Sequence, residues 1–234
     1  MTASSIRTAL LFSSWLTLAA SAAPAQPAAG GATSAASAIH KGGGAKKKKK
    51  PRRPIFSGYQ VSESSLRSEP LGRPSGQLVM TSVNDPSAYL AVNIYRADGS
   101  YNDDALDQLN HFWRCRRTGT EKAIDPHLFE ILSHVYDRFQ RPIELVSGFR
   151  NQKRTSSYHF IGSASDIRIT GVPERELKEF IESLDTGGMG IGIYPQGHFI
   201  HVDIRPEPSY RWVDYSPPGS GDLGRPKRRR APNS

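Results

Sequence analysis

Two short segments, far apart along the chain, place the strongest constraint on its fold. The first reads S-x-H-x-x-G-x-A-x-D from Ser157 to Asp166, and the second reads H-F-I-H-V-D from His198 to Asp203. Two imidazoles and one carboxylate with an open fourth position form the ligand set of a hydrolytic zinc site. Because His201 follows Asp166 by more than 30 residues, only a fold that brings the two segments together can close such a site.

The residues between His159 and Asp166 fit such a site. They include Gly162, Ala164 and two serines, and small residues let the backbone turn tightly and approach a metal closely. One histidine by itself is a weak signal, because most histidines are structural or lie on the surface. The complete ten-residue pattern is far more specific and favours a metal site.

The two ends of the chain differ in composition from its centre. Residues 1–54 contain no Asp or Glu, and residues 217–234 are rich in Pro, Gly and Arg. The remaining stretch of about 160 residues is long enough for one domain with a hydrophobic core. We therefore expect a folded domain at residues 55–216, a disordered basic linker at residues 23–54 and a disordered basic tail at residues 217–234.

The formal net charge of +9 comes from these ends. Residues 55–224 contain 17 basic and 22 acidic residues, which leaves this central part with a net charge of −5. A nucleic-acid-binding domain should carry a basic surface, so we expect no nucleic-acid partner. The basic ends are interpreted either as solvated spacers or as segments that adhere to anionic wall or membrane polymers.

Residues 1–22 have the features of a secretory signal peptide. Arg7 precedes an apolar run at residues 8–20, and Ala20-Ser21-Ala22 is a cleavage site of the A-x-A type. The run is short for an uncleaved membrane anchor, and no cysteine follows it, so a lipoprotein is not expected. We expect an exported monomer, periplasmic or associated with the cell envelope. Since Cys115 is the only cysteine, no Cys-based zinc site is expected within the chain.

Short strands and a few helices are predicted along the central region. Apolar residues at helical spacing predict helices at residues 103–116, 125–141 and 173–186. Runs of β-forming residues predict strands at residues 77–83, 89–95, 143–146, 189–194 and 199–204, and a further strand after Asp166. This pattern is typical of an α+β domain with a small, mostly antiparallel sheet and flanking helices.

The ten-residue block resembles that of zinc peptidases that act on D-amino-acid peptides of bacterial cell walls. Their clan includes the D-Ala-D-Ala peptidases and the hedgehog signalling domain. The closer resemblance, from about Leu78 to Trp212, is to the murein endopeptidase K (YcbK-like) family. Its signs are the Leu-x-x-Leu-Asn helix ending near Arg116, the Ile-Asp-Pro helix start, the S-G-F-R segment, the metal block, the G-M-G-I-G-x-Y strand, His-Val-Asp and the Arg211-Trp212 pair.

The resemblance implies a hedgehog/D-Ala-D-Ala peptidase-like fold and makes residues 55–216 a zinc peptidase domain that cuts peptide cross-links of peptidoglycan. It implies that Zn²⁺ is held by His159, Asp166 and His201. It also implies that Arg150 binds a carboxylate of the peptide stem that serves as substrate, for which a planar guanidinium is suited.

The chain departs from the clan's pattern at the position of the catalytic acid or base. Clan members often carry a catalytic Glu or a second His just before the last ligand, but here position 199 is Phe, and the nearby candidate is His198. Asp203 shares a strand face with His201 and is expected to orient a ligand imidazole or a neighbouring arginine. The expected catalytic set is therefore His198, Arg150 and Asp203.

Several functions remain open at this point. A murein endopeptidase is favoured over a non-catalytic wall-binding module on the same fold, and a D,D- or L,D-carboxypeptidase is a further alternative. The acidic central region disfavours an adhesion or nucleic-acid-binding protein. The residues do not distinguish cleavage of D,D from cleavage of L,D cross-links.

Overall fold

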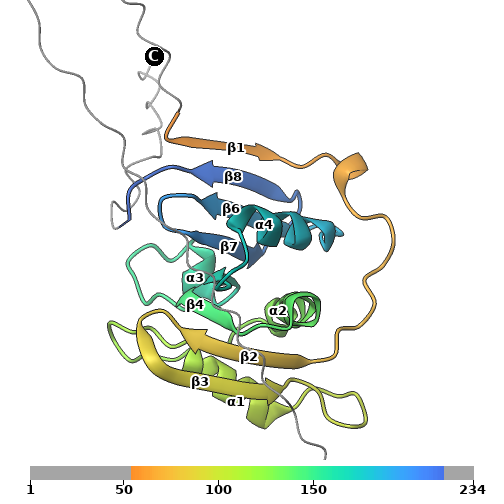
Figure 1. Ribbon diagram of the computed structural model, residues 1–234, viewed down its shortest axis with the longest axis vertical. Helices are drawn as coiled ribbons and strands as arrows, with labels where there is room; N and C mark the ends of the chain where they lie inside the picture. The colour runs from red at the N-terminus through yellow and green to blue at the C-terminus, as the bar shows by residue number, and fades with distance from the viewer. Residues whose placement is uncertain (1–53, 219–234) are drawn as a thin grey trace, which may run out of the picture. The chain divides into compact units, whose positions relative to one another are not determined.

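The computed structural model describes residues 54–218 (Figure 1). The predicted signal peptide at residues 1–22 lies outside the described residues. So do the linker at 23–54, apart from its last residue, and the tail at 217–234, apart from its first two residues. Those boundaries stay predictions. Within the described residues, no helix is both long and apolar enough to cross a membrane.

An eight-stranded sheet with the order β1-β8-β6-β7-β5-β4-β2-β3 forms the framework (Figure 1). Its strands are β1 (Phe56–Gln60), β2 (Gln77–Ser82), β3 (Asp85–Asn93), β4 (Ile143–Ser147), β5 (Ala164–Arg168), β6 (Met189–Tyr194), β7 (Phe199–Ile204) and β8 (Tyr210–Asp214). Only the pairs β2–β4 and β6–β8 are parallel. The predicted α+β class and the mostly antiparallel sheet are confirmed, and the sheet is larger than predicted because β1 and β8 extend it.

Within residues 54–218, four α-helices and one 3-10 helix accompany the sheet. They are η1 (Glu63–Ser65), α1 (Asp103–Phe112), α2 (Pro126–Phe139), α3 (Tyr158–Ile161) and α4 (Glu174–Ser183). Helix α2 begins as predicted, with Pro126 as its first residue and with the Asp125 side chain accepting a hydrogen bond from the His127 N–H at 3.0 Å. The short α3 has too few residues for a helical pattern, and the sequence did not predict it.

Helix α1 begins at Asp103, as predicted, with Asn102 at its N-cap, but it ends at Phe112, earlier than the predicted residue 116. The chain turns here because the next backbone groups bond elsewhere. The Cys115 N–H donates to the Thr120 carbonyl at 2.8 Å, and the Trp113 carbonyl accepts from the Phe149 N–H at 2.9 Å. This turn therefore holds the segment after β4 in place.

The first hairpin also differs from the prediction. The second strand was expected to begin at residue 89, but β3 begins at Asp85, so that only Val83 and Asn84 separate it from β2. The second predicted hairpin, β6 with β7, is present with Tyr194 paired to Phe199.

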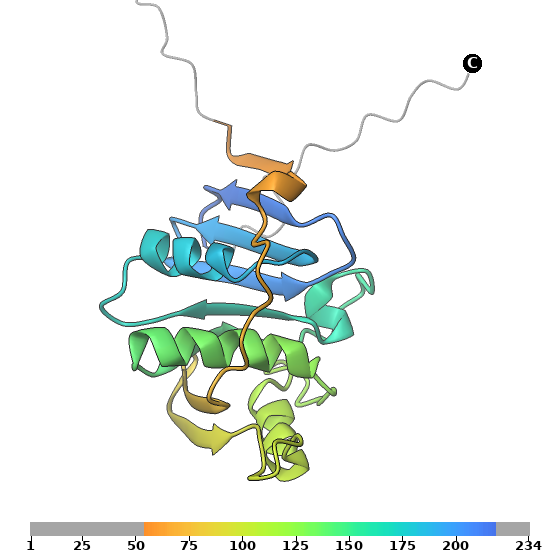
Figure 2. The same cartoon turned by 90° about the vertical axis from the view of Figure 1, so that its right-hand side faces the viewer.

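The central strands have one face covered by helices, and their other face carries the buried polar residues Asp166, His201 and Asp203. Helices α2 and α4 lie on the same side of the sheet (Figure 2). Ile167, Ile200 and Val202 join the apolar core that includes residues of these two helices. Because successive side chains of a strand point to opposite faces, Asp166 and His201 lie on the face away from α2 and α4.

Candidate metal centre

Three buried side chains from separate elements meet on the uncovered face of the sheet. His159 comes from α3, Asp166 from β5 and His201 from β7, and one ligand atom of each lies within 4.8 Å of the others. Antiparallel pairing of β5 with β7 sets Asp166 directly opposite His201. His201 Nδ1 is 2.8 Å from Asp166 Oδ1, and His159 Nε2 is 3.3 Å from the same oxygen. The fold thus joins the two segments that the sequence singled out.

The outer hydrogen bonds of the two rings determine which nitrogen faces the cluster. His159 Nδ1 lies 2.7 Å from the Gly148 carbonyl oxygen, which can only accept, so this nitrogen carries a proton. His201 Nε2 lies 2.8 Å from Asp203 Oδ2 and donates to that carboxylate. When both rings are neutral, the unprotonated His159 Nε2 and His201 Nδ1 face Asp166 together.

This donor set fits Zn²⁺. Two imidazole nitrogens and a carboxylate oxygen converge, as the ligands of a bound cation do. Two nitrogens and one oxygen are zinc ligands that leave a fourth tetrahedral position open. His159, Asp166 and His201 would therefore hold the ion, as the resemblance implied.

The pKa values of the cluster reflect the same balance. Burial lowers the pKa of His201, but its hydrogen bonds to Asp166 and Asp203 outweigh burial and raise the pKa to about 8. Burial alone would raise the pKa of Asp166, yet the neighbouring His159 and Arg150 hold it well below its usual range. Burial lowers the pKa of His159. The cluster therefore keeps an anionic carboxylate and at least one neutral imidazole, the forms that bind a metal.

Asp203 contacts His201 and is itself held by an arginine. The Asp203 carboxylate is fully buried. Arg205 donates from Nε to Asp203 Oδ1 at 2.7 Å and from a terminal nitrogen to Asp203 Oδ2 at 2.5 Å. A carboxylate behind a ligand histidine fixes the ring and its tautomer. The Asp203 carboxylate therefore contacts both His201 and Arg205, and its role in orienting His201 stays a prediction.

Two glycines of β6 leave space for the side chains of Arg205 and Trp212. A Cβ atom at Gly190 would lie 2.0 Å from a terminal nitrogen of Arg205, and one at Gly192 would lie 2.1 Å from the Trp212 indole. The Trp212 ring in turn lies 5.0 Å from the His201 ring, centroid to centroid. The alternating glycines of the G-M-G-I-G-x-Y strand thus let Arg205 and Trp212 pack beside the ligand histidine.

Arg150 reaches the cluster from the segment after β4. Its Nε donates to Ser147 Oγ at 2.8 Å, and a terminal nitrogen forms an ion pair with Asp166 Oδ2. The side chain is 42% exposed, so part of the guanidinium also faces the surroundings. This position next to Asp166, a predicted metal ligand, is compatible with the predicted contact to a substrate carboxylate.

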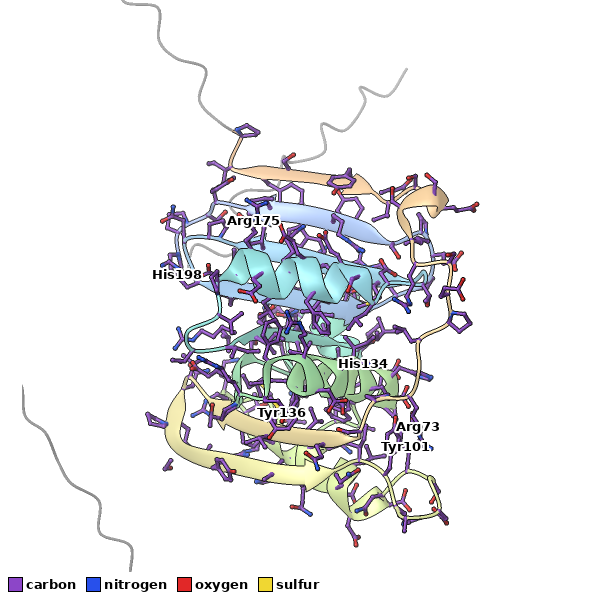
Figure 3. All side chains as sticks on the ribbon, turned by 45° about the vertical axis from the view of Figure 1, so that its right-hand side comes forward. Arg73, Tyr101, His134, Tyr136, Arg175 and His198 are labelled. Atoms are coloured by element: carbon purple, nitrogen blue, oxygen red, sulfur yellow. The ribbon has the colours of Figure 1, made fainter. Side chains whose placement is uncertain are left out.

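His198 is the one predicted site residue that the fold does not bring to the cluster. It lies in the β6–β7 turn with a left-handed φ of 53°. Its Nδ1 is 2.8 Å from Glu174 Oε1 of α4, and its side chain is 73% exposed. Figure 3 shows His198 beside α4, on the helix-covered side of the sheet. The predicted acid–base role of His198 thus has no geometric support in the described residues, because the turn directs the ring to α4.

A cleft of about 670 Å³ opens over the cluster. Its lining comes from the loop at residues 150–158, the β6–β7 hairpin, β8 with the residues that follow it to Pro218, and Phe56 of β1. The volume is in the range of ligand-binding pockets. The site is thus buried at its base and open to a ligand above.

Tyr194 presents a phenol to this cleft, although it was not predicted from the sequence. Its oxygen accepts a hydrogen bond from Trp212 Nε1 at 3.1 Å, so its own proton can be donated to a ligand. Burial raises the pKa of Tyr194 to about 12, which keeps the phenol protonated at neutral pH. Its ring stacks on Phe199 at 4.5 Å between centroids.

Arg205 was also missed, although a signal existed. It continues the alternation of His201 and Asp203 by two residues, so extending the strand pattern past Ile204 would have placed it on the same face. Phe56 gave no such signal, because β1 is short and reaches the cleft only by pairing with β8.

Known proteins similar to this chain come from one family. A family model described as Peptidoglycan L,D-endopeptidase MepK matches residues 87–210. The chain is 33% identical over 120 residues to Peptidoglycan L,D-endopeptidase MepK of Escherichia coli strain K12, covering 45% of this chain and 65% of that protein. It is 34% identical over 123 residues to the Probable peptidoglycan L,D-endopeptidase MepK of Haemophilus influenzae, covering 46% and 65%. The chain thus spans just under two thirds of the curated relatives it matches, and no solved structure matches it.

Proposed function

Because the chain belongs to the peptidoglycan L,D-endopeptidase MepK family, whose model matches more than half of it, we propose that it is a zinc-dependent peptidase of peptidoglycan. It hydrolyses peptide cross-links and takes the peptide stems as substrate. The observation that carries the proposal is the convergence of His159, Asp166 and His201 at the base of an open cleft. The names of the relatives favour L,D cross-links and endopeptidase action over D,D cleavage or carboxypeptidase action.

His159, Asp166 and His201 would hold the Zn²⁺ ion, which would activate a water molecule and polarise the scissile carbonyl. The protein supplies the geometry for this chemistry. Gly148 and Asp203 hold the two ligand rings in the tautomers that leave one lone pair each for the metal. Both partners are groups of the protein itself, so the fold orients the two rings.

Arg150 and Tyr194 are the groups that would contact the substrate. The exposed part of the Arg150 guanidinium is suited to a carboxylate of the stem, which would orient the peptide. The protonated Tyr194 phenol is a donor for the oxygen that becomes negative as the carbonyl is attacked. The two groups then have separate roles, one in binding and the other in stabilising developing charge.

We further propose that the protein is exported to the periplasm or cell envelope and acts as a monomer. The features of residues 1–22 support export, and the basic ends support adhesion to anionic wall or membrane polymers. The acidic central region is the reason not to expect a nucleic-acid partner.

The test is to incubate the full-length protein with purified cross-linked muropeptide dimers, with added zinc and with a chelator. We expect conversion of dimers to monomers with zinc, no conversion with chelator, and one zinc per chain by elemental analysis. A zinc-loaded protein that binds the dimers without cleaving them would overturn the proposal and leave a wall-binding module.

A further inference from the structure

A second hollow, of about 350 Å³, lies next to the metal cleft. Arg150 and Gln152 line both of them. The second hollow is enclosed mainly by the end of β4, the segment that follows it and the turn after α1. A ligand that passes Arg150 can therefore extend from the metal centre into this hollow.

Positive charge is concentrated around this junction. Residues 114–122 and 150–154 contain seven Lys and Arg residues and one acidic residue, Glu121. Glu121 is already engaged, because its Oε1 is 2.7 Å from His111 Nδ1. The concentration is unusual for this domain, since residues 55–224 as a whole have a net charge of −5.

Three arginines of the hollow are held by neutral oxygens. Arg116 donates to the Asn84 carbonyl at 3.0 Å, Arg117 to the Asn151 carbonyl, and Arg114 to the His111 carbonyl at 2.8 Å. Within residues 54–218, none of the three forms an ion pair. Their positions are thus determined by neutral groups, while their charges have no carboxylate in contact.

Asp85 is an acidic group whose charge interacts with two of these arginines. The pKa of Asp85 is lowered first by its hydrogen bonds from Ser87, with smaller contributions from Arg116 and Arg114. Asp85 is itself bonded to Ser87, whose hydroxyl donates at 2.7 Å. It therefore does not close the hollow to another anion.

We propose that this hollow is a subsite for the free carboxylates of an acidic peptide, the arm of the substrate that continues past Arg150 from the metal centre. This rests on the proposed function and deepens it. A cross-link joins two peptide stems, so an enzyme that cuts it must hold peptide on both sides of the scissile bond. Planar guanidinium groups match carboxylates in two-point contacts. The carboxylates are assigned to a peptide because the hollow joins the cleft for which we propose a peptide substrate.

The test is equilibrium binding of a cross-linked muropeptide dimer to the full-length protein, by calorimetry in the presence of chelator so that no cleavage occurs. A second ligand is the same dimer with its carboxylates converted to amides. Arg116→Gln/Arg117→Gln should bind the unmodified dimer at least about tenfold more weakly than the unsubstituted protein, the scale of a charge-assisted hydrogen bond. It should bind the amidated dimer as the unsubstituted protein does.

Matched variants separate charge from folding. Arg116→Lys/Arg117→Lys keeps the charges and should recover much of the affinity for the unmodified dimer. Arg175→Gln on α4 removes an exposed arginine elsewhere and should leave the affinity for both dimers unchanged. Equal binding of the unmodified dimer by the Gln variant and the unsubstituted protein would overturn the subsite. So would an equal loss for both ligands, or no dimer binding by the unsubstituted protein.

The two proposals fail in different ways. If the unsubstituted protein binds the dimer with the expected arginine dependence but zinc restores no cleavage, the peptidase function is wrong and the subsite stands. If the protein cleaves dimers and Arg116→Gln/Arg117→Gln has an unchanged KM, the subsite is wrong and the peptidase function stands.

Discussion

The two faces of strands β5 and β7 carry opposite chemistry although their residues alternate along the same segments. On the face covered by α2 and α4, Ile167, Ile200 and Val202 are fully buried in the core. On the other face, Asp166 and Asp203 are almost as deeply buried but are ionisable. An apolar side chain contributes about 1.5–3 kcal/mol when it is buried, whereas a buried charge is tolerated only with a specific partner.

This difference means that each face can be perturbed separately. The apolar face needs neighbours that fill space, and its loss should appear as lower stability. The polar face needs atoms at given distances, and its loss should appear as lower metal affinity or turnover with the fold retained.

The largest effect is expected for the metal ligands. His159→Ala, Asp166→Ala and His201→Ala should each lose stoichiometric zinc and all measurable turnover, because three ligands leave no substitute. Elemental analysis measures the zinc content, and muropeptide cleavage measures the turnover. The control on the opposite face is Ile200→Val, which should lose about 1 kcal/mol of unfolding free energy and keep zinc and turnover. An alanine variant with full zinc and normal turnover would remove that residue from the ligand set.

Tyr194→Phe should come next, with a loss in kcat of about a hundredfold, the scale of one donor to a developing oxyanion. Zinc content should not change, since the phenol does not contact the three ligands, and Phe keeps the stacking on Phe199. Steady-state kinetics on soluble dimers measure the effect, with Tyr89→Phe on the exposed surface of β3 as control. A change confined to KM would assign Tyr194 to substrate binding instead.

Arg205→Gln should weaken zinc affinity by about ten- to a hundredfold, because Asp203 loses the charge that holds it against His201. Chelator competition measures the zinc dissociation constant directly. Gly190→Ala should act in the same direction, since its Cβ would displace the Arg205 guanidinium. Arg175→Gln serves as the control, and an unchanged zinc affinity in Arg205→Gln would show that Asp203 orients His201 without help.

The smallest effect is expected for His198→Ala. Its ring contacts Glu174 on the helix-covered side, so turnover should stay within about twofold, whereas loss of a general base costs about 10²–10⁴ in rate. Steady-state kinetics on the same dimers distinguish a turn residue from a general base. A loss of a hundredfold or more would restore the role that the sequence suggested and would require the turn to move toward the metal.

Local chemistry made much of the fold predictable. The Asp125-Pro126 start of α2 and the β6–β7 hairpin depend on residues within a few positions of one another. Strands β1 and β8 were not predicted because pairing with distant strands stabilises them more than their own residues do. The end of α1 was misjudged for a related reason, since the Trp113 carbonyl bonds to Phe149 across the fold.

The sequence by itself determined which residues could bind a metal, because imidazole and carboxylate groups are the ligands of zinc and the small residues between His159 and Asp166 allow a close approach of the backbone. Only the tertiary structure decided which neighbours support them. Arg205 lies behind Asp203 because Gly190 leaves space for it, and His198 points away because its turn adopts a left-handed backbone. Identity of residues is a property of the chain, but the direction of a side chain depends on backbone angles and on contacts with residues far away in sequence.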